Sequence, residues 1–151
     1  MQEYEIMVKE CYAPIIQKYN LQFIKYNDYT FFLVGYGFAF WVFANTREER
    51  GETWYISINE KGEILRYSLM YIDIGRFTKE DRAFVGNPTT IDEHIEVYFR
   101  IYCKGLMNRC DDILSGKKEW LKDYPSKGSK SNYIPKFLKP YFEEQGFIVN
   151  D

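Results

Sequence analysis

Hydrophobic residues recur at spacings of three and four over the first 20 positions, which is the period of an amphipathic helix. The apolar positions that share one helical face are Tyr4, Met7, Val8, Cys11, Tyr12, Ile15 and Tyr19. Pro14 lies inside this stripe, and because a proline removes a helical hydrogen bond, we expect a kink or a split there. The pattern predicts a helix over 4–19 that ends at Asn20.

After residue 20 the period changes to two, which is the period of β-strands. The alternation predicts an antiparallel meander of four to five strands, at 21–26, 29–35, 38–45, 52–59 and 64–72. Residues 38–43 are apolar at every position, which is typical of a central strand covered on both faces. The charged segment 45–52 is predicted to form a long hairpin tip.

The turn residues at 59–64 place the last two strands in register. A loop of two or four residues there pairs positions whose numbers sum to 123. Trp54 then lies on an apolar face, whereas Tyr55 and Arg66 share a half-polar face. Since a shift of one residue would set apolar against polar side chains, we expect this register and a half-polar face in contact with water.

A second helix is predicted to begin at Thr90, which forms a capping box with Glu93. Its buried face comprises Ile91, Ile95, Tyr98, Tyr102, Leu106, Cys110 and Ile113. Gly116 suits a left-handed helix end, which gives a helix of about 24 residues. A helical turn near 119–121, a flexible polar loop at 126–132 and a short helical tail follow.

Together these elements predict a single α+β domain that spans residues 1–151. Its N-terminal helix is followed by the antiparallel meander, and the long C-terminal helix packs on the sheet ahead of the helical tail. The chain holds 14 Tyr, 12 Phe and 3 Trp. Because aromatic residues favour strands and bury large areas, this composition predicts an aromatic-packed sheet. Some of the tyrosines are alternatively suited to line a binding face.

Charge and cysteine usage restrict the partners and the compartment. The net charge of −2 argues against nucleic acid, because phosphate contacts need a basic field. Residues 117–139 hold seven lysines and two acids, which is typical of a solvated surface and less often of an anion-binding patch. The longest apolar run, 31–44, is too short to span a membrane. Three cysteines without an export signal predict reduced thiols in a cytoplasmic protein.

Few residues carry reactive chemistry, and the predicted long helix keeps them apart. Cys103 and Cys110 would lie about 10.5 Å apart along its axis, too far to share a zinc ion or a disulfide. His94 is the single histidine, and it precedes Cys103 by nine residues on the same helix. We therefore expect no catalytic residue, no metal and no cofactor, and a non-enzymatic role is the favoured interpretation.

The end of the long helix also carries a family resemblance. Tyr102-Cys103, the run Cys110-Asp-Asp-Ile-Leu-Ser-Gly116 and Trp120-Leu121 resemble the C-terminal helix of small bacterial immunity proteins. Those proteins are the cytosolic partners of polymorphic or contact-dependent toxins. The order of helix, antiparallel meander and long helix is also similar to some of these families. The resemblance covers residues 102–121 and implies a non-enzymatic inhibitor that binds a toxin.

Two functions remain open from the sequence. A protein-binding module, in the form of an immunity protein that neutralises a cognate toxin, fits the missing catalytic set. Tyr and Arg are favoured contact residues and charges at the rim steer association, so the predicted contacts are Glu48, Glu49, Glu52, Tyr55 and Arg66. The alternative is a small-molecule-binding or enzymatic domain with an aromatic pocket between the sheet and the long helix.

Overall fold

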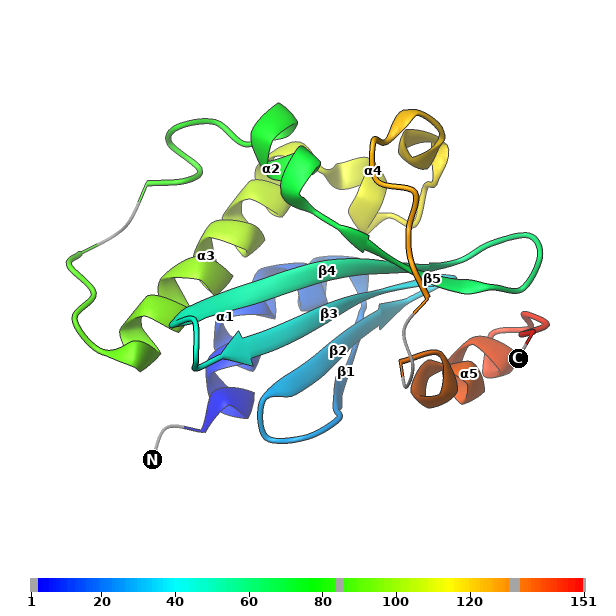
Figure 1. Cartoon of the computed structure of the whole chain (residues 1–151), viewed down its shortest axis with the longest axis horizontal. Coiled ribbons are helices and arrows are strands. Elements are labelled where there is room, and N and C mark those ends of the chain that lie inside the picture. Colours follow the sequence, from blue (N-terminus) through cyan, green and yellow to red (C-terminus); the bar gives the residue numbers. More distant parts are fainter. Residues whose placement is uncertain (1–2, 84–85, 131–133, 151) are drawn as a thin grey trace.

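A five-stranded antiparallel sheet lies at the centre of the computed structural model, with helices on both of its faces (Figure 1). The structure describes residues 3–83, 86–130 and 134–150. The elements, in chain order, are α1 (Tyr4–Tyr19), β1 (Gln22–Lys25), β2 (Thr30–Gly35), β3 (Phe38–Asn45), β4 (Arg50–Ile58), β5 (Ile64–Ser68), α2 (Met70–Arg76), α3 (Ile91–Arg109), α4 (Asp111–Leu114), the 3-10 helix η1 (Glu119–Asp123) and α5 (Ile134–Glu144). The predicted α+β architecture is confirmed.

Helices α1 and α3 pack on one face of the sheet, which we call the helical face. Tyr12 of α1 lies 5.9 Å from Phe99 of α3, measured between ring centroids, and its hydroxyl hydrogen-bonds Thr53 of β4. Helix α5 packs on the opposite face, which we call the open face, where Leu138 and Phe142 are fully buried. The sheet is thus covered by two helices on one side and by α5 on the other.

The strands follow one another in the order β1–β2–β3–β4–β5, and each pairs antiparallel with the next. The central strand, β3, is buried on both faces from Phe38 to Val42, which confirms the prediction from its continuous apolar run. Cross-strand partners point to the same face, so the register decides which side chains meet the helices. Phe40 pairs with Tyr55 on the helical face, and Trp41 pairs with Trp54 on the open face.

The predicted register of the last two strands is wrong by one residue. Trp54 pairs with Ser68 and Ile56 pairs with Arg66, so the paired numbers sum to 122. A shift of one residue moves every side chain of a strand to the other face. Arg66 therefore lies on the face of Trp54, and Tyr55 lies on the opposite face.

The turn between these strands gives the physical reason for the error. The N–H of Asn59 donates to the carbonyl of Glu63 at 2.9 Å, which closes a loop of three residues. Gly62, the last of the three, has a φ of 78°, a left-handed conformation that glycine adopts without strain. The prediction assumed loops of two or four residues, and a three-residue loop changes the pairing by one.

Two further elements differ from the prediction. Strand β5 ends at Ser68, not at residue 72, because the Ser68 hydroxyl accepts a hydrogen bond from the N–H of Met70 and the chain turns into α2. The long helix ends at Arg109, since Cys110 has non-helical angles (φ −132°, ψ 42°) before α4 begins. Arg76 of α2 stabilises this break: its guanidinium donates to the Arg109 carbonyl and to Asp112.

The predicted helix boundaries are otherwise largely correct. Helix α1 runs through Pro14 without interruption and ends at Asn20, which adopts a left-handed conformation with φ 53°. The capping box of Thr90 and Glu93 at the start of α3 is present with both of its hydrogen bonds. Of the loop predicted at 126–132, residues 131 and 132 lie outside the described part of the chain. Ser129 exchanges two backbone hydrogen bonds with Arg66 along the outer edge of β5.

Candidate functional site

Helix α5 covers only part of the open face. In Figure 1 it lies under the right-hand part of the sheet, near the β4–β5 hairpin. Three large aromatic side chains continue the face toward the β3–β4 loop: Trp41, Phe43 and Trp54. Trp41 stacks 6.2 Å from Phe43 and lies 5.9 Å from Trp54, measured between ring centroids. Phe43 and Trp54 are only half-buried, so this surface remains accessible.

Arg66 of β5 completes this surface. The centre of its guanidinium lies 4.5 Å from the ring centroid of Trp54 and 5.0 Å from that of Trp41. A cation over an aromatic face is stabilised by the ring quadrupole, by about 0.5–2 kcal/mol. We call Trp41, Phe43, Trp54 and Arg66 the aromatic platform. Its four side chains come from three adjacent strands and combine three aromatic rings, of which that of Trp41 is buried, with one positive charge.

Acidic and polar residues border the end of the platform near the β3–β4 loop. The Glu52 carboxylate accepts hydrogen bonds from Asn45 Nδ2 at 2.6 Å and from Trp54 Nε1 at 3.2 Å, and Arg50 lies 3.7 Å away. These contacts fix the indole of Trp54 in place. Beside Phe43, the loop encloses a shallow depression of about 430 Å³ that is lined by Tyr29, Phe43, Ala44, Asn45, Thr46, Arg47 and Glu48.

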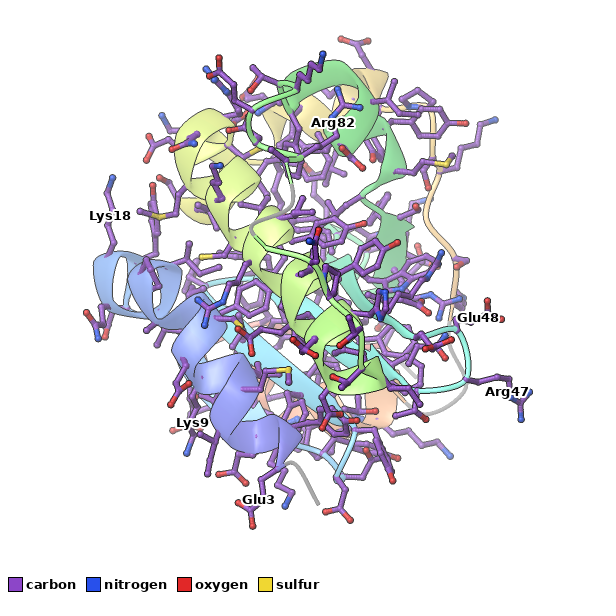
Figure 2. The ribbon with its side chains drawn as sticks, turned by 90° about the vertical axis from the view of Figure 1, so that its left-hand side faces the viewer. Glu3, Lys9, Lys18, Arg47, Glu48 and Arg82 are labelled. Atoms are coloured by element: carbon purple, nitrogen blue, oxygen red, sulfur yellow. The ribbon has the colours of Figure 1, made fainter. Side chains whose placement is uncertain are left out.

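The β3–β4 loop extends beyond the ends of its two strands, and Thr46 at its base lines the same depression as Tyr4 and Glu5 of α1. Figure 2 shows Arg47 and Glu48 projecting from its tip into solvent, away from α1. Glu49 is also exposed and has a φ of 53°, which is uncommon for a residue with a side chain. A charged tip is therefore present, but it is shorter than the predicted 45–52: Asn45 pairs with Arg50 and Phe43 with Glu52 in the sheet, so only residues 46–49 form the loop.

The structure brings together four of the five predicted contact residues and separates the fifth. Glu48, Glu49 and Glu52 lie at the loop end of the platform, and Arg66 forms part of it. Tyr55 is fully buried on the helical face, where its ring packs against Phe38 and Trp120. Burial raises the pKa of the Tyr55 hydroxyl well above its usual range. Since Tyr55 has no exposed surface, it is unsuited to contact a partner.

The three aromatic residues of the platform are not recognisable as a surface from the sequence alone. Trp41 and Phe43 belong to a continuous apolar run, and such a run gives no sign of which positions a helix leaves uncovered. Trp54 was placed on an apolar face that was expected to be buried. The signal that was available is the three-residue turn, because it sets Arg66 beside Trp54.

The reactive side chains do not form a catalytic group within the described residues. His94 is half-buried, and its Nδ1 lies 2.8 Å from the carbonyl of Thr90, one turn earlier in the chain. All three cysteines are buried free thiols. Burial raises the pKa of Cys11 to about 12, and the pKa of Cys103 and of Cys110 to about 11 each. Such thiols are poor nucleophiles at neutral pH.

In the described part of the chain, no group of three or more His, Cys, Asp or Glu side chains is arranged to hold a metal ion. An open depression of about 520 Å³ does collect acids near the N-terminus, among them Glu3, Glu5 and Asp92. Lys25 lies in the same depression and pairs with Glu5, and Asp92 accepts a hydrogen bond from Tyr4. The acids there are partly paired, which suits a solvated surface.

The space between the sheet and the long helix α3 is filled by side chains. Phe31, Phe40, Ile95, Phe99 and Leu106 are each fully buried in one continuous core cluster between the helical face and the helices. An aromatic pocket at this interface was the alternative predicted from the sequence. The packing leaves that alternative without support from the described residues.

Comparison with known proteins gives no relative from which to transfer a function. No protein-family model matches the chain, and neither a curated protein nor a solved structure matches it. Among the described residues, none of the helices combines the length and the apolar character needed to cross a lipid bilayer.

Proposed function

We propose that this chain is a non-enzymatic protein-binding module and that its partner docks on the aromatic platform. The single observation that carries the proposal is the platform itself: Phe43, Trp54 and Arg66 are half-buried on the open face and lie around the buried ring of Trp41. Trp and Arg are the residue types that most often dominate the binding energy of protein interfaces. Exposed large apolar surfaces with a polar rim commonly mark such interfaces.

The surroundings of the platform support this proposal. The depression beside Phe43 has room for a side chain of a partner. The charges on Arg47, Glu48 and Glu49 are exposed at the rim, where charges act mainly on the rate and specificity of association. A core of half-buried aromatic residues inside a charged rim is the usual anatomy of a specific interface.

In its more specific form, we propose that the module is a cytoplasmic immunity protein that binds and neutralises a toxin. The resemblance at residues 102–121 supports this form, and so does the order of the elements. The three buried free thiols suit a reducing compartment. In this form the neutralising surface is the aromatic platform, and residues 102–121 contribute to the scaffold behind it.

Co-expression with the products of the genes that neighbour its own, followed by tandem purification, tests the proposal. We expect a stable complex with the unaltered chain. Trp54→Ala should weaken the complex by about 2 kcal/mol, or roughly 30-fold, because it removes a central aromatic contact. Tyr36→Ala is the matched control, since Tyr36 is 69% exposed at the opposite end of the strands, and it should change affinity by less than about threefold.

Circular dichroism and urea unfolding of each variant separate lost binding from lost folding. The proposal fails if none of the neighbouring gene products forms a complex with the unaltered chain. The placement on the platform fails if Trp54→Ala folds normally and binds as tightly as the Tyr36→Ala control.

A further inference from the structure

We infer that Arg66 receives a carboxylate from the partner, so the partner presents an Asp or Glu side chain to the aromatic platform. This inference rests on the proposed function and adds the chemical nature of the contact. The first observation is the pairing of the arginines. Ion pairs within 4 Å fix most of them, namely Arg50, Arg76, Arg82, Arg100 and Arg109. Arg66 is half-buried and forms no ion pair with the described residues.

The second observation is a pair of buried donors without acceptors. Arg66 Nε and Trp41 Nε1 are both shielded from solvent, and neither has a hydrogen-bond partner among the described residues. Trp41 is only 9% exposed. Leaving a buried donor unpaired costs about 1–3 kcal/mol, so such groups mark places where an acceptor is missing. Both donors lie where the guanidinium stacks on the two indole rings.

The guanidinium is held in position before any partner arrives. Two backbone hydrogen bonds of 2.8 Å with Ser129 fix the main chain of Arg66 at the edge of the sheet. The two indole rings contact the centre of its guanidinium, at 4.5 Å for Trp54 and 5.0 Å for Trp41. A planar guanidinium matches a carboxylate with two parallel hydrogen bonds. Because the Arg66 side chain is already ordered, it loses less conformational entropy when a partner binds.

Nearby charges direct a carboxylate to this end of the platform. Glu63, the acid that immediately precedes β5, forms an ion pair with Lys130 at 3.3 Å and not with Arg66. Glu52 is already engaged, because its carboxylate accepts a hydrogen bond from Trp54 Nε1 at 3.2 Å and lies 3.7 Å from Arg50. The platform therefore has a basic group at Arg66 that forms no ion pair with the described residues, whereas Glu48 and Glu49 are exposed on the β3–β4 loop. A complementary partner carries its carboxylate over Arg66 and its basic residues toward the loop.

Titration with small blocked amino acids tests the inference without the partner. The probe is N-acetyl-glutamate N-methylamide, and the control probe is the glutamine analogue, which has the same shape without the charge. Proton–nitrogen NMR spectra follow the Nε–H signal of Arg66 and the indole N–H signals of Trp41 and Trp54. We expect saturable shifts of all three with the glutamate probe, and at least tenfold weaker binding of the glutamine probe.

Two variants and one internal control complete the experiment. Arg66→Gln should abolish the indole shifts, and Arg66→Lys should weaken them about tenfold, because an ammonium keeps the charge but loses the planar fork. The Arg47 signal reports non-specific ion pairing, since Arg47 is exposed at the loop tip. The inference is overturned if the glutamate probe gives no saturable shift up to about 0.1 M, or if Arg47 responds at the same concentration as Arg66.

Failure of this inference is distinguishable from failure of the proposed function. If the probe binds at Arg66 but co-expression yields no complex, the carboxylate site stands and the proposed function falls. If a complex forms through Trp54 but the probe does not bind and Arg66→Gln keeps full affinity for the partner, only the role of Arg66 is wrong.

Discussion

Two charged side chains outside the aromatic platform are enclosed by the fold and stabilise it. Asp81 is 1% exposed in the connection between α2 and α3. Its carboxylate accepts hydrogen bonds from the N–H of Thr78, from Asn108 and from Arg109. Burial opposes its charge, but these hydrogen bonds outweigh burial and hold the pKa of Asp81 well below its usual range.

We expect Asp81→Asn to lower the free energy of unfolding by about 2–4 kcal/mol, because one oxygen that accepts hydrogen bonds becomes a donor group. Asp28→Asn is the matched control: Asp28 is 83% exposed and pairs only with Lys25, so its loss should cost less than about 0.5 kcal/mol. Urea unfolding at pH 7 measures both. Similar losses in the two variants would contradict the role of Asp81.

The pH dependence gives a second measure of Asp81. Its folded pKa is lowered, so its stabilisation is fully present above the unfolded pKa, about 4, and is lost as the pH falls toward the folded value. The native chain should therefore lose stability below about pH 4 more steeply than Asp81→Asn. The free energy of unfolding, measured with urea between pH 2 and 5, should thus change with pH at different slopes in the two chains. Equal slopes would contradict this explanation, and Asp28→Asn again serves as the control.

Lys118 is the second enclosed charge. Its ammonium donates to the carbonyls of Gly37 and Ile58 at 2.7 and 2.8 Å, which ties the segment after α4 to the turn between β2 and β3 and to the end of β4. Burial lowers the pKa of Lys118 to about 8. The unfolded chain therefore binds more protons at this group between pH 8 and about 10.5, and the stability contributed by Lys118 rises with pH over that window.

We expect Lys118→Met to destabilise the fold at pH 7 through the loss of two hydrogen bonds, by about 1–3 kcal/mol. The stability difference between the native chain and this variant should grow between pH 8 and 10. Comparing the two chains cancels the opposing contribution of the three buried thiols, whose raised pKa values favour unfolding above pH 9 in both. Lys117→Met, on the exposed neighbour, should leave no such trend.

At the scale of the elements, local patterns in the sequence predicted most helices and strands, and the errors arose at turns and element ends. The capping box at Thr90 and the continuous apolar run of β3 are local patterns, and both predictions are confirmed. The pairing of β4 with β5 depends on one left-handed glycine, Gly62, which alternation along the strands does not reveal. The break at Cys110 depends on Arg76, whose guanidinium donates a hydrogen bond to the Arg109 carbonyl. Because Arg76 is far away in the sequence, this contact exists only when α2 and α3 are packed together.

Two helical glycines provide a test of how tightly the elements pack. A Cβ added to Gly105 of α3 would lie 2.4 Å from the ring of Phe77, whereas one added to Gly75 of α2 has nothing within 4 Å. Alanine favours a helix over glycine by about 1 kcal/mol. We expect Gly75→Ala to raise the free energy of unfolding by about 0.5–1 kcal/mol, and Gly105→Ala to lower it by about 1–3 kcal/mol. Thermal or urea unfolding measures the stability of both variants. Stabilisation by both substitutions would contradict the packing of Phe77 on α3.

For the whole molecule, the fold class followed from the sequence but the aromatic platform did not. Four of the five predicted contact residues lie on the platform or at its rim, because charged residues in a hairpin tip and on an edge strand reach the surface in most arrangements. Tyr55 was misplaced together with the strand register. The platform itself depends on where α5 ends its coverage of the open face, and that is set by long-range contacts such as the hydrogen bond from Gln145 Nε2 to the carbonyl of Gly35.

The central claim is that a protein partner docks on the open face beside α5. Amide hydrogen exchange on the purified complex and on the free chain tests it most directly. The account predicts slower exchange in the complex at residues 45–50 of the β3–β4 loop and at residues 64–68 of β5, with α1 unchanged. Slower exchange confined to α1 and α3, with the loop and β5 exchanging as in the free chain, would contradict it.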